Sequence, residues 1–356
     1  MGNTSSQDKK SGARERVHTT KPSIQEEHDP SDDEAAEAES QGIVNDEKSG
    51  LLGMSVELLD MVGDHLTPQD RKELAAVNRS MHSVFSTSNL HAKFLECVAY
   101  GQQDHAERLL NQLFDGQPVK IQAILLHKGR FTDYSGRTFH CSAYEYAYWA
   151  KDTHMCRMLE RYMDFETKAK MLTRIDVIEA YGLSFKQDDE EKISSHFDFT
   201  SLKEAYQRYL DGFDAWYAAQ NWPAIDSAWL DVGKSQRNVP AHVAQEYCRP
   251  GRSFDPTPDF NQLILPRVLT FYNLTTEQVS SWFPLMVSNS GLGFHFSLMR
   301  SSSLWRVAAG VRREVPPDIV GADLAAITRL DEVRTADLLL SREHLNPPAM
   351  SQSMSV

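Results

Sequence analysis

The sequence predicts a mainly helical protein with a small β-containing unit near its C-terminus. Through most of 51–250, apolar residues recur at spacings of three and four, which is the period of amphipathic helices. Beyond Tyr247, proline and glycine breakers separate short runs of β-branched and aromatic residues, a pattern typical of strands. Hydrophobic residues make up 41% of the 356 residues, which is enough for a sizeable core.

Composition and charge argue against several classes of function. The formal net charge is −13, from 37 basic and 50 acidic residues, whereas a nucleic-acid binder needs concentrated Lys and Arg to neutralise phosphates. No apolar run approaches the ~18 residues of a transmembrane helix, and the N-terminus lacks the apolar core of a secretory signal. The four cysteines are scattered without a disulfide framework, which is typical of a reducing compartment. We therefore expect a soluble, intracellular protein that binds no nucleic acid.

We expect residues 1–50 to form a disordered tail. The segment contains no Phe, Trp or Tyr and few aliphatic residues, so it cannot bury enough apolar surface to offset the entropy of ordering. Residues 1–24 carry a net charge of +3, and residues 25–49 carry a net charge of −9. We interpret the acidic block as a solvated spacer.

The chain begins with a pattern for N-myristoylation. Met1 to Ser6 match M-G-x-x-x-[ST], in which the amine of Gly2 is acylated. One myristoyl chain gives only marginal membrane affinity, so a basic cluster would have to supply the second signal. The alternative is a chance match, since Met-Gly is a common start. The cluster that would bind an anionic membrane surface is Lys9, Lys10, Arg14 and Arg16.

Residues 51–90 predict two short helices. A first helix capped by Ser55 is followed by Leu66-Thr-Pro-Gln-Asp70, and a second helix places Leu74, Val77 and Met81 on one face. In this order and spacing the segment resembles the F-box, a degenerate helical motif of about 40 residues. Met54-Ser55 departs from the Leu-Pro usual at the start of the motif. The resemblance implies that the apolar face docks on the Skp-family adaptor of a cullin ubiquitin ligase, and the alternative is a plain helical hairpin. The residues predicted to bind the adaptor are Met54, Leu58, Leu59, Val62, Leu66, Pro68, Leu74 and Val77.

Residues 91–165 contain two similar segments. The segments 94–110 and 142–159 each predict a helix, a tight turn and a second helix, with turns at Gly101 and at Lys151-Asp152. Together they resemble degenerate ankyrin-like repeats. The intervening Phe131–Phe139 predicts a hairpin finger that turns at Ser135-Gly136. A generic stack of helical hairpins is the alternative. In either case the finger side is the expected binding surface.

Candidate catalytic and metal-binding residues are few. His140-Cys141 and His154-x-Cys156 lack the paired spacing of a zinc site. The acidic run 188–191 predicts a loop between helices, and Gly291-Leu-Gly-Phe294 predicts a turn or strand edge. Cys248, six residues after His242, could form a nucleophile pair, but no orienting third residue is identifiable. We expect no metal, no cofactor and no catalytic residue.

The C-terminal half is predicted to contain a helical region at 166–250 and a small mixed α/β region at 251–340. Short strands are expected at 268–272, 282–283 and 294–298, followed by a helix over 323–340. Residues 341–356 are polar and predict a disordered tail.

The strings Lys128–Cys156 and Val239–Pro250 with Phe254–Asp259 are similar to segments of ankyrin-bearing effectors of intracellular bacteria. Such effectors enter eukaryotic cells through the type IVB (Dot/Icm) secretion system, so the resemblance implies secretion into the host cytoplasm, with membrane association if Gly2 is acylated. The leading hypothesis is an F-box substrate receptor that recruits a host Skp–cullin ligase to an unidentified target protein. The alternatives are an interaction-only effector that sequesters a host protein, and an enzyme that uses Cys248.

Overall fold

The computed structural model describes residues 62, 65–77, 79–113, 117–273, 278–282, 297–301 and 315–346. The chain divides into two units, residues 1–48 and 49–356, and every described residue belongs to the second. The described part contains eleven helices and six strands, so the predicted mainly helical class is confirmed. Gly2, the basic cluster, the acidic block and the first predicted F-box residues (Met54, Leu58 and Leu59) lie outside the described residues.

The first two helices begin where the sequence predicts a break. α2 (Pro68–Ala75) starts with Pro68 in its first turn, and Thr67 caps it, because its Oγ1 accepts a hydrogen bond from the Asp70 amide at 3.2 Å. α3 (Arg79–Ala99) follows after a short turn. The expectation of one helix through Leu74, Val77 and Met81 is therefore wrong. The Val77 amide bonds the Leu74 carbonyl at 3.1 Å, a tight closing turn that ends α2, and the Val77 side chain is 66% exposed.

Two helical hairpins follow the predicted pattern. α3 turns at Gly101 into α4 (Gln103–Leu113), and α6 (Ala143–Trp149) turns at Lys151-Asp152 into α7 (Thr153–Glu160). Gly101 has a φ of 64°, and a Cβ there would lie 2.9 Å from the Ala241 side chain, so the turn requires glycine. α3 packs on α6 and α4 on α7. Both hairpins are confirmed as local structure, whereas no sequence repeat is detected and the ankyrin assignment stays a prediction.

A four-stranded antiparallel sheet lies in the middle of the chain. β1 (Gly129–Thr132) and β2 (Thr138–Cys141) form the predicted finger, and β3 (Leu183–Gln187) and β4 (Glu190–Ser194) extend it in the order β1-β2-β3-β4. The expected loop at 188–191 is wrong. Asp188 and Asp189 have φ values of 53° and 64°, which makes them the two central residues of a tight hairpin turn, and the acids that follow begin β4.

Helices cover one face of this sheet and extend beyond it. α5 (Pro118–Leu126) and α8 (Phe165–Tyr181) pack against each other, and α9 (Thr200–Ala218) packs against α10 (Trp222–Arg237). α11 (Ala241–Cys248) is buried along its whole length. None of the helices in the described ranges is both long and apolar enough to cross a bilayer.

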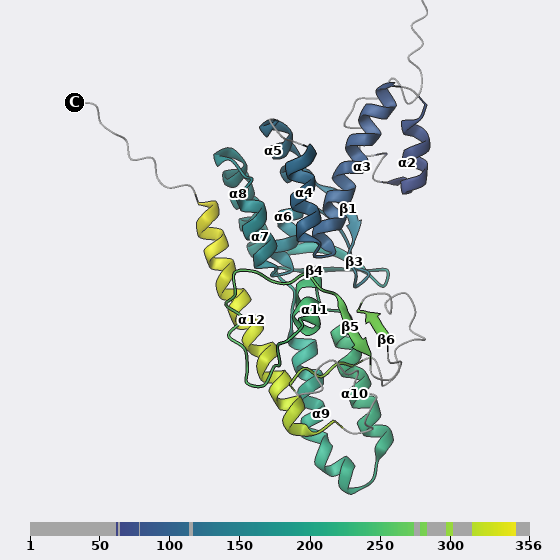
Figure 1. Ribbon diagram of the computed structural model, residues 1–356, viewed down its shortest axis with the longest axis vertical. Helices are drawn as coiled ribbons and strands as arrows, with labels where there is room; N and C mark the ends of the chain where they lie inside the picture. Colours follow the sequence, from purple (N-terminus) through teal and green to yellow (C-terminus); the bar gives the residue numbers. More distant parts are fainter. Residues whose placement is uncertain are drawn as a thin grey trace, which may run out of the picture. The chain divides into compact units, whose positions relative to one another are not determined.

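The C-terminal region contains a small hairpin and one long helix. β5 (Thr270–Asn273) and β6 (Gln278–Ser281) pair antiparallel, close to the first strand predicted there, whereas 283 and 294–296 lie outside the described residues. α12 (Pro317–Leu345) is longer at both ends than the predicted helix over 323–340. Its last residues were expected in a disordered tail, but Ser341 and Leu345 are buried and packing continues the helix. Figure 1 shows α12 running first beside α9 and then beside α7 and α8.

The core of the sheet region is aromatic. Side chains alternate along a strand, and the inward Phe131, Phe139 and Phe185 are at most 9% exposed. They contact Tyr146 and Trp149 of α6, with ring centroids between 4.8 and 5.3 Å apart in four of these pairs. One face of the sheet is thereby fixed to the helices, and the other face is left for solvent or a partner.

Candidate functional site

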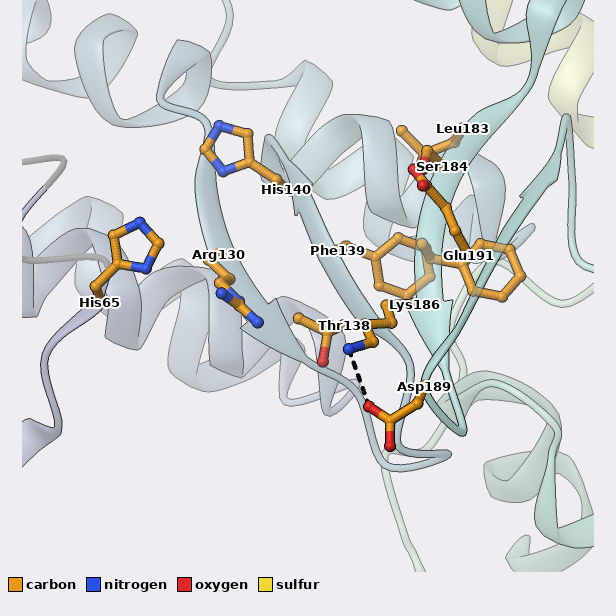
Figure 2. A pocket seen from close by; sticks show the side chains of 11 residues that line it. His65, Arg130, Thr138, Phe139, His140, Leu183, Ser184, Lys186, Asp189 and Glu191 are labelled. Carbon is orange, nitrogen blue, oxygen red and sulfur yellow. Dashed lines mark hydrogen bonds and ion pairs between the residues drawn. The ribbon is translucent and has the colours of Figure 1, made fainter.

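The outer face of the four-stranded sheet carries a pocket of about 630 Å³. It forms because the strand positions between the buried phenylalanines point away from the helices, and His65, which precedes α2, lines one side. Figure 2 shows the imidazole of His65 across the pocket from the strand residues. The lining residues are His65, Arg130, Thr138, Phe139, His140, Leu183, Ser184, Phe185, Lys186, Asp189 and Glu191.

Arg130 and His140 line this pocket without a partner among the described residues. Arg130 of β1 lies opposite His140 of β2 in the strand register, and both side chains are exposed. Neither forms a hydrogen bond or ion pair within the part of the chain that the structure describes. An arginine guanidinium stays charged at every physiological pH and presents donors that suit a carboxylate or phosphate. This end of the pocket therefore suits an acidic group of a partner.

The other end of the pocket is internally paired. Lys186 Nζ lies 2.9 Å from Asp189 Oδ1, and Ser184 Oγ donates to Glu191 Oε1 at 2.8 Å (Figure 2 draws the first pair). The hydrogen bond from Lys186 lowers the pKa of the Asp189 carboxyl below its ordinary value. The pocket thus has an acidic rim at the β3–β4 turn, where Asp189 and Glu191 are paired, and a cationic end at β1–β2, where Arg130 has no partner among the described residues.

Most of the predicted adaptor-binding residues that are described lie at the ends of α2. Val62, Leu66 and Leu74 are half-buried, and Val77 is exposed. Pro68 occupies the first turn of α2, which packs against α3. The structure therefore brings Leu66, Pro68 and Leu74 onto one short helix and its cap. The docking of an adaptor on this helix stays a prediction.

Cys248 and His242 are placed in the core. Both side chains are at most 5% exposed. Burial raises the pKa of the Cys248 thiol to about 12, with only a partial opposing effect from Arg300, and burial lowers the pKa of His242 to about 3. Because a nucleophilic cysteine needs a lowered pKa, this environment disfavours the thiolate at neutral pH. Among the described residues, no group of three or more His, Cys, Asp or Glu is arranged to hold a metal ion.

Sequence reasoning missed half of the outer-face pocket. The finger at β1–β2 is the expected binding surface, but Leu183, Ser184 and Lys186 come from β3, a strand that is not predicted from the sequence. A sequence signal for β3 is nevertheless present, because apolar and polar residues alternate from Leu183 to Lys186. Its shortness and the acidic run that follows gave it the composition of a solvated loop.

The chain is similar to a protein of Coxiella burnetii. The family model described as CBUA0006 C-terminal domain matches residues 201–345, which begin in the first turn of α9 and end with the last residue of α12. Over 277 residues the chain is 37% identical to the uncharacterized protein CBUA0006 of Coxiella burnetii (strain RSA 493 / Nine Mile phase I), which covers 74% of this chain and 77% of that protein. No solved structure matches the chain. The chain belongs to the family of CBUA0006.

Proposed function

We propose that the protein is a non-catalytic adaptor, secreted by a bacterium, that joins a host Skp–cullin ubiquitin ligase to a target protein. The support is the F-box-like string at 51–90, whose central break forms the capped start of α2. The relative in Coxiella burnetii agrees with a bacterial origin. The ankyrin-like reading of the two helical hairpins belongs to the same proposal, because stacked helix pairs commonly present a binding surface.

The length and continuity of α3 support the proposal beyond the motif alone. α3 is a continuous helix of 21 residues, so it spans about 30 Å. Its first part packs with α2, and its last part is in the core, where Phe94, Leu95 and Val98 are at most 3% exposed. A single helix thus connects the F-box-like region to the sheet and the hairpins. An adaptor needs such a fixed connection, because ubiquitin transfer requires the target to be held at a set distance from the ligase.

The outer-face pocket is the proposed target surface. Its open end at Arg130 and His140 favours an acidic segment of the target, and Leu183 supplies an apolar contact. Under the alternative, in which the protein only sequesters a host protein, the same pocket would bind but no ubiquitin would be transferred. The buried Cys248 thiol gives no support to the enzyme reading.

The adaptor proposal is tested with purified Skp-family adaptor and the full chain in a titration. Truncation of apolar anchors at such interfaces costs about 2 kcal/mol or more, so Leu58→Ala combined with Leu66→Ala should weaken binding at least about 30-fold. The matched control is Leu339→Ala on α12, where the side chain is 65% exposed, and its binding should equal that of the wild type. The proposal is wrong if the wild-type chain does not bind, or if the double variant binds as well as the control.

A further inference from the structure

A second cavity lies at the junction of the sheet with α9 and α10. It has a volume of about 620 Å³, which is within the range of small-molecule sites. β3 and β4 form one wall, and the first turn of α9 and the end of α10 form another. The lining includes Arg137, Lys192, Ile193, Phe197, Asp198 and Ser201.

Arg137 is a buried cation with an unused donor. Its side chain lies in the cavity wall, the residue is 3% exposed, and its Nη2 atom is buried without a hydrogen-bond partner among the described residues. The guanidinium carbon lies 5.1 Å from the ring centroid of Trp149 and 5.3 Å from that of Phe197. A buried N–H group without an acceptor is costly. The arrangement therefore favours a ligand that brings an acceptor to this guanidinium.

Asp133 fixes Arg137 in place without using all of its donors. Arg137 Nε donates to Asp133 Oδ2 at 2.9 Å, and the same carboxylate accepts hydrogen bonds from the Ser135 and Arg137 amides and from the Tyr146 hydroxyl. The guanidinium is thus held on its Nε side and between two rings. Such preorganisation lowers the entropy lost when a ligand binds.

The start of α9 is a second, independent feature that favours negative charge. α9 has 19 residues, and Ser201 in its first turn lines the cavity, where the positive end of the helix dipole lies. Lys192 adds a cation on β4, and its nearest acidic partner, Glu190, is 3.8 Å away. Asp198 opposes these groups, but its Oδ1 already accepts from the Thr200 amide at 2.8 Å. Asp133 and Glu190 partly neutralise Arg137 and Lys192, so the attraction for an anion rests on the unused Arg137 donor and on the start of α9.

We propose that this cavity binds a small organic anion. Its oxyanion would accept hydrogen bonds from Arg137 at the first turn of α9, and its apolar body would lie against Phe197 and the 64% exposed Ile193. The site uses none of the residues assigned to the adaptor function, so it stands whether or not that function is correct. A carboxylate and a phosphate monoester share the required chemistry.

The experiment is calorimetric titration of the full chain with phenyl phosphate, benzoate and neutral benzyl alcohol. One equivalent of phenyl phosphate or benzoate should bind, the tighter of the two identifying the head group, and benzyl alcohol should bind at least about tenfold more weakly because it lacks the charge. If neither anion binds at millimolar concentration, or if benzyl alcohol binds equally well, the proposal is wrong.

Variants locate the binding. Ser201→Asp places a negative charge in the cavity, and anion affinity should fall about tenfold. The first turn of a helix tolerates acidic residues, so this variant should keep the fold. The neutral control Ser201→Asn should change the affinity little. Lys192→Gln should weaken binding two- to fivefold, and Lys186→Gln in the outer-face pocket should not change it. Equal affinity for Ser201→Asp and Ser201→Asn would overturn the assignment.

Discussion

Arg267 connects three parts of the fold, and we expect it to contribute strongly to stability. From the segment before β5, its guanidinium donates to both carboxylate oxygens of Asp152 at 2.7 and 3.0 Å, to Gln103 Oε1 at 2.6 Å and to Gln245 Oε1 at 2.8 Å. Asp152 also caps α7, since its Oδ1 accepts from the Met155 amide at 3.1 Å. One side chain thus connects the turns of both helical hairpins with α11. We expect Arg267→Leu to lower the free energy of unfolding by about 3–5 kcal/mol, the cost of breaking a buried ion pair.

The expected loss of unfolding free energy follows from the Asp152 carboxylate, which would remain buried without its cation. Asp152 and Arg267 side chains are 6% and 9% exposed. Burial alone raises the pKa of Asp152, but Arg267 outweighs it and holds that pKa well below the ordinary value of 3.8. This group therefore stabilises the fold above pH 4, and the contribution is lost as the pH falls below that. Without Arg267 the burial effect is uncompensated, so the deficit should be largest at neutral pH and smaller where Asp152 becomes protonated.

Urea unfolding at pH 7 and pH 4, followed by tryptophan fluorescence, measures both effects. The control is Arg329→Leu, which removes an exposed pair with Glu332 and should cost less than about 1 kcal/mol. Adding Asp152→Asn to Arg267→Leu removes the stranded charge and keeps a capping side chain, so it should restore part of the stability. A loss below about 1 kcal/mol at pH 7, or an equal loss at both pH values, would refute the reasoning.

Three further predictions follow from burial and from the chain start. Burial lowers the pKa of His154 and of His242 to about 3, below the ordinary 6.5. The unfolded chain therefore binds more protons, and stability is lost as the pH falls below 6.5. His242→Gln should reduce the loss of Tm between pH 7 and pH 5. The raised pKa of Cys248 predicts that iodoacetamide does not label it in the native protein at pH 7.5, and mass spectrometry that found fast labelling would contradict this. Gly2→Ala should abolish myristoylation in eukaryotic cells and move the protein from membrane to cytosol fractions, whereas an unmodified wild-type Gly2 in the mass spectrum would exclude lipidation.

Local chemistry explains which parts of the fold could be predicted from the sequence. The starts of α2 and α6 are specified within four residues, because Thr67 with Asp70 and Ser142 with Glu145 form capping boxes. The turn at Gly101 and the finger at β1–β2 also depend on residues close in sequence. These elements lie where they were expected.

Features that depend on distant residues could not be predicted in this way. β3 has only five residues and pairs with β2, which ends 42 residues before β3 begins, and β4 in turn pairs with β3. The short alternation in β3 does not reveal this distant partner. Arg267 and Asp152 are 115 residues apart. The cavity beside α9 combines residues from the finger, α6, the β3–β4 hairpin, α9 and α10. Neither site leaves a motif in the sequence, and only the fold brings its members together.

The segment matched by the family model depends on the chain that precedes it. Residues 201–345 include Arg267, whose buried carboxylate partner is Asp152, and Asp331, which lies 2.7 Å from Lys151 Nζ. The second half of α12 packs on α7 and α8, and His344 Nδ1 lies 3.1 Å from Glu160 Oε2. Cutting the chain at residue 200 would leave Arg267 without its carboxylate partner and Asp331 with Lys203 alone, and it would expose the face of α12 that the earlier helices cover. The match with CBUA0006 extends over 74% of the chain, beyond this segment, as such an interdependence requires. The described residues before α9 are therefore part of the same folded unit as the C-terminal segment.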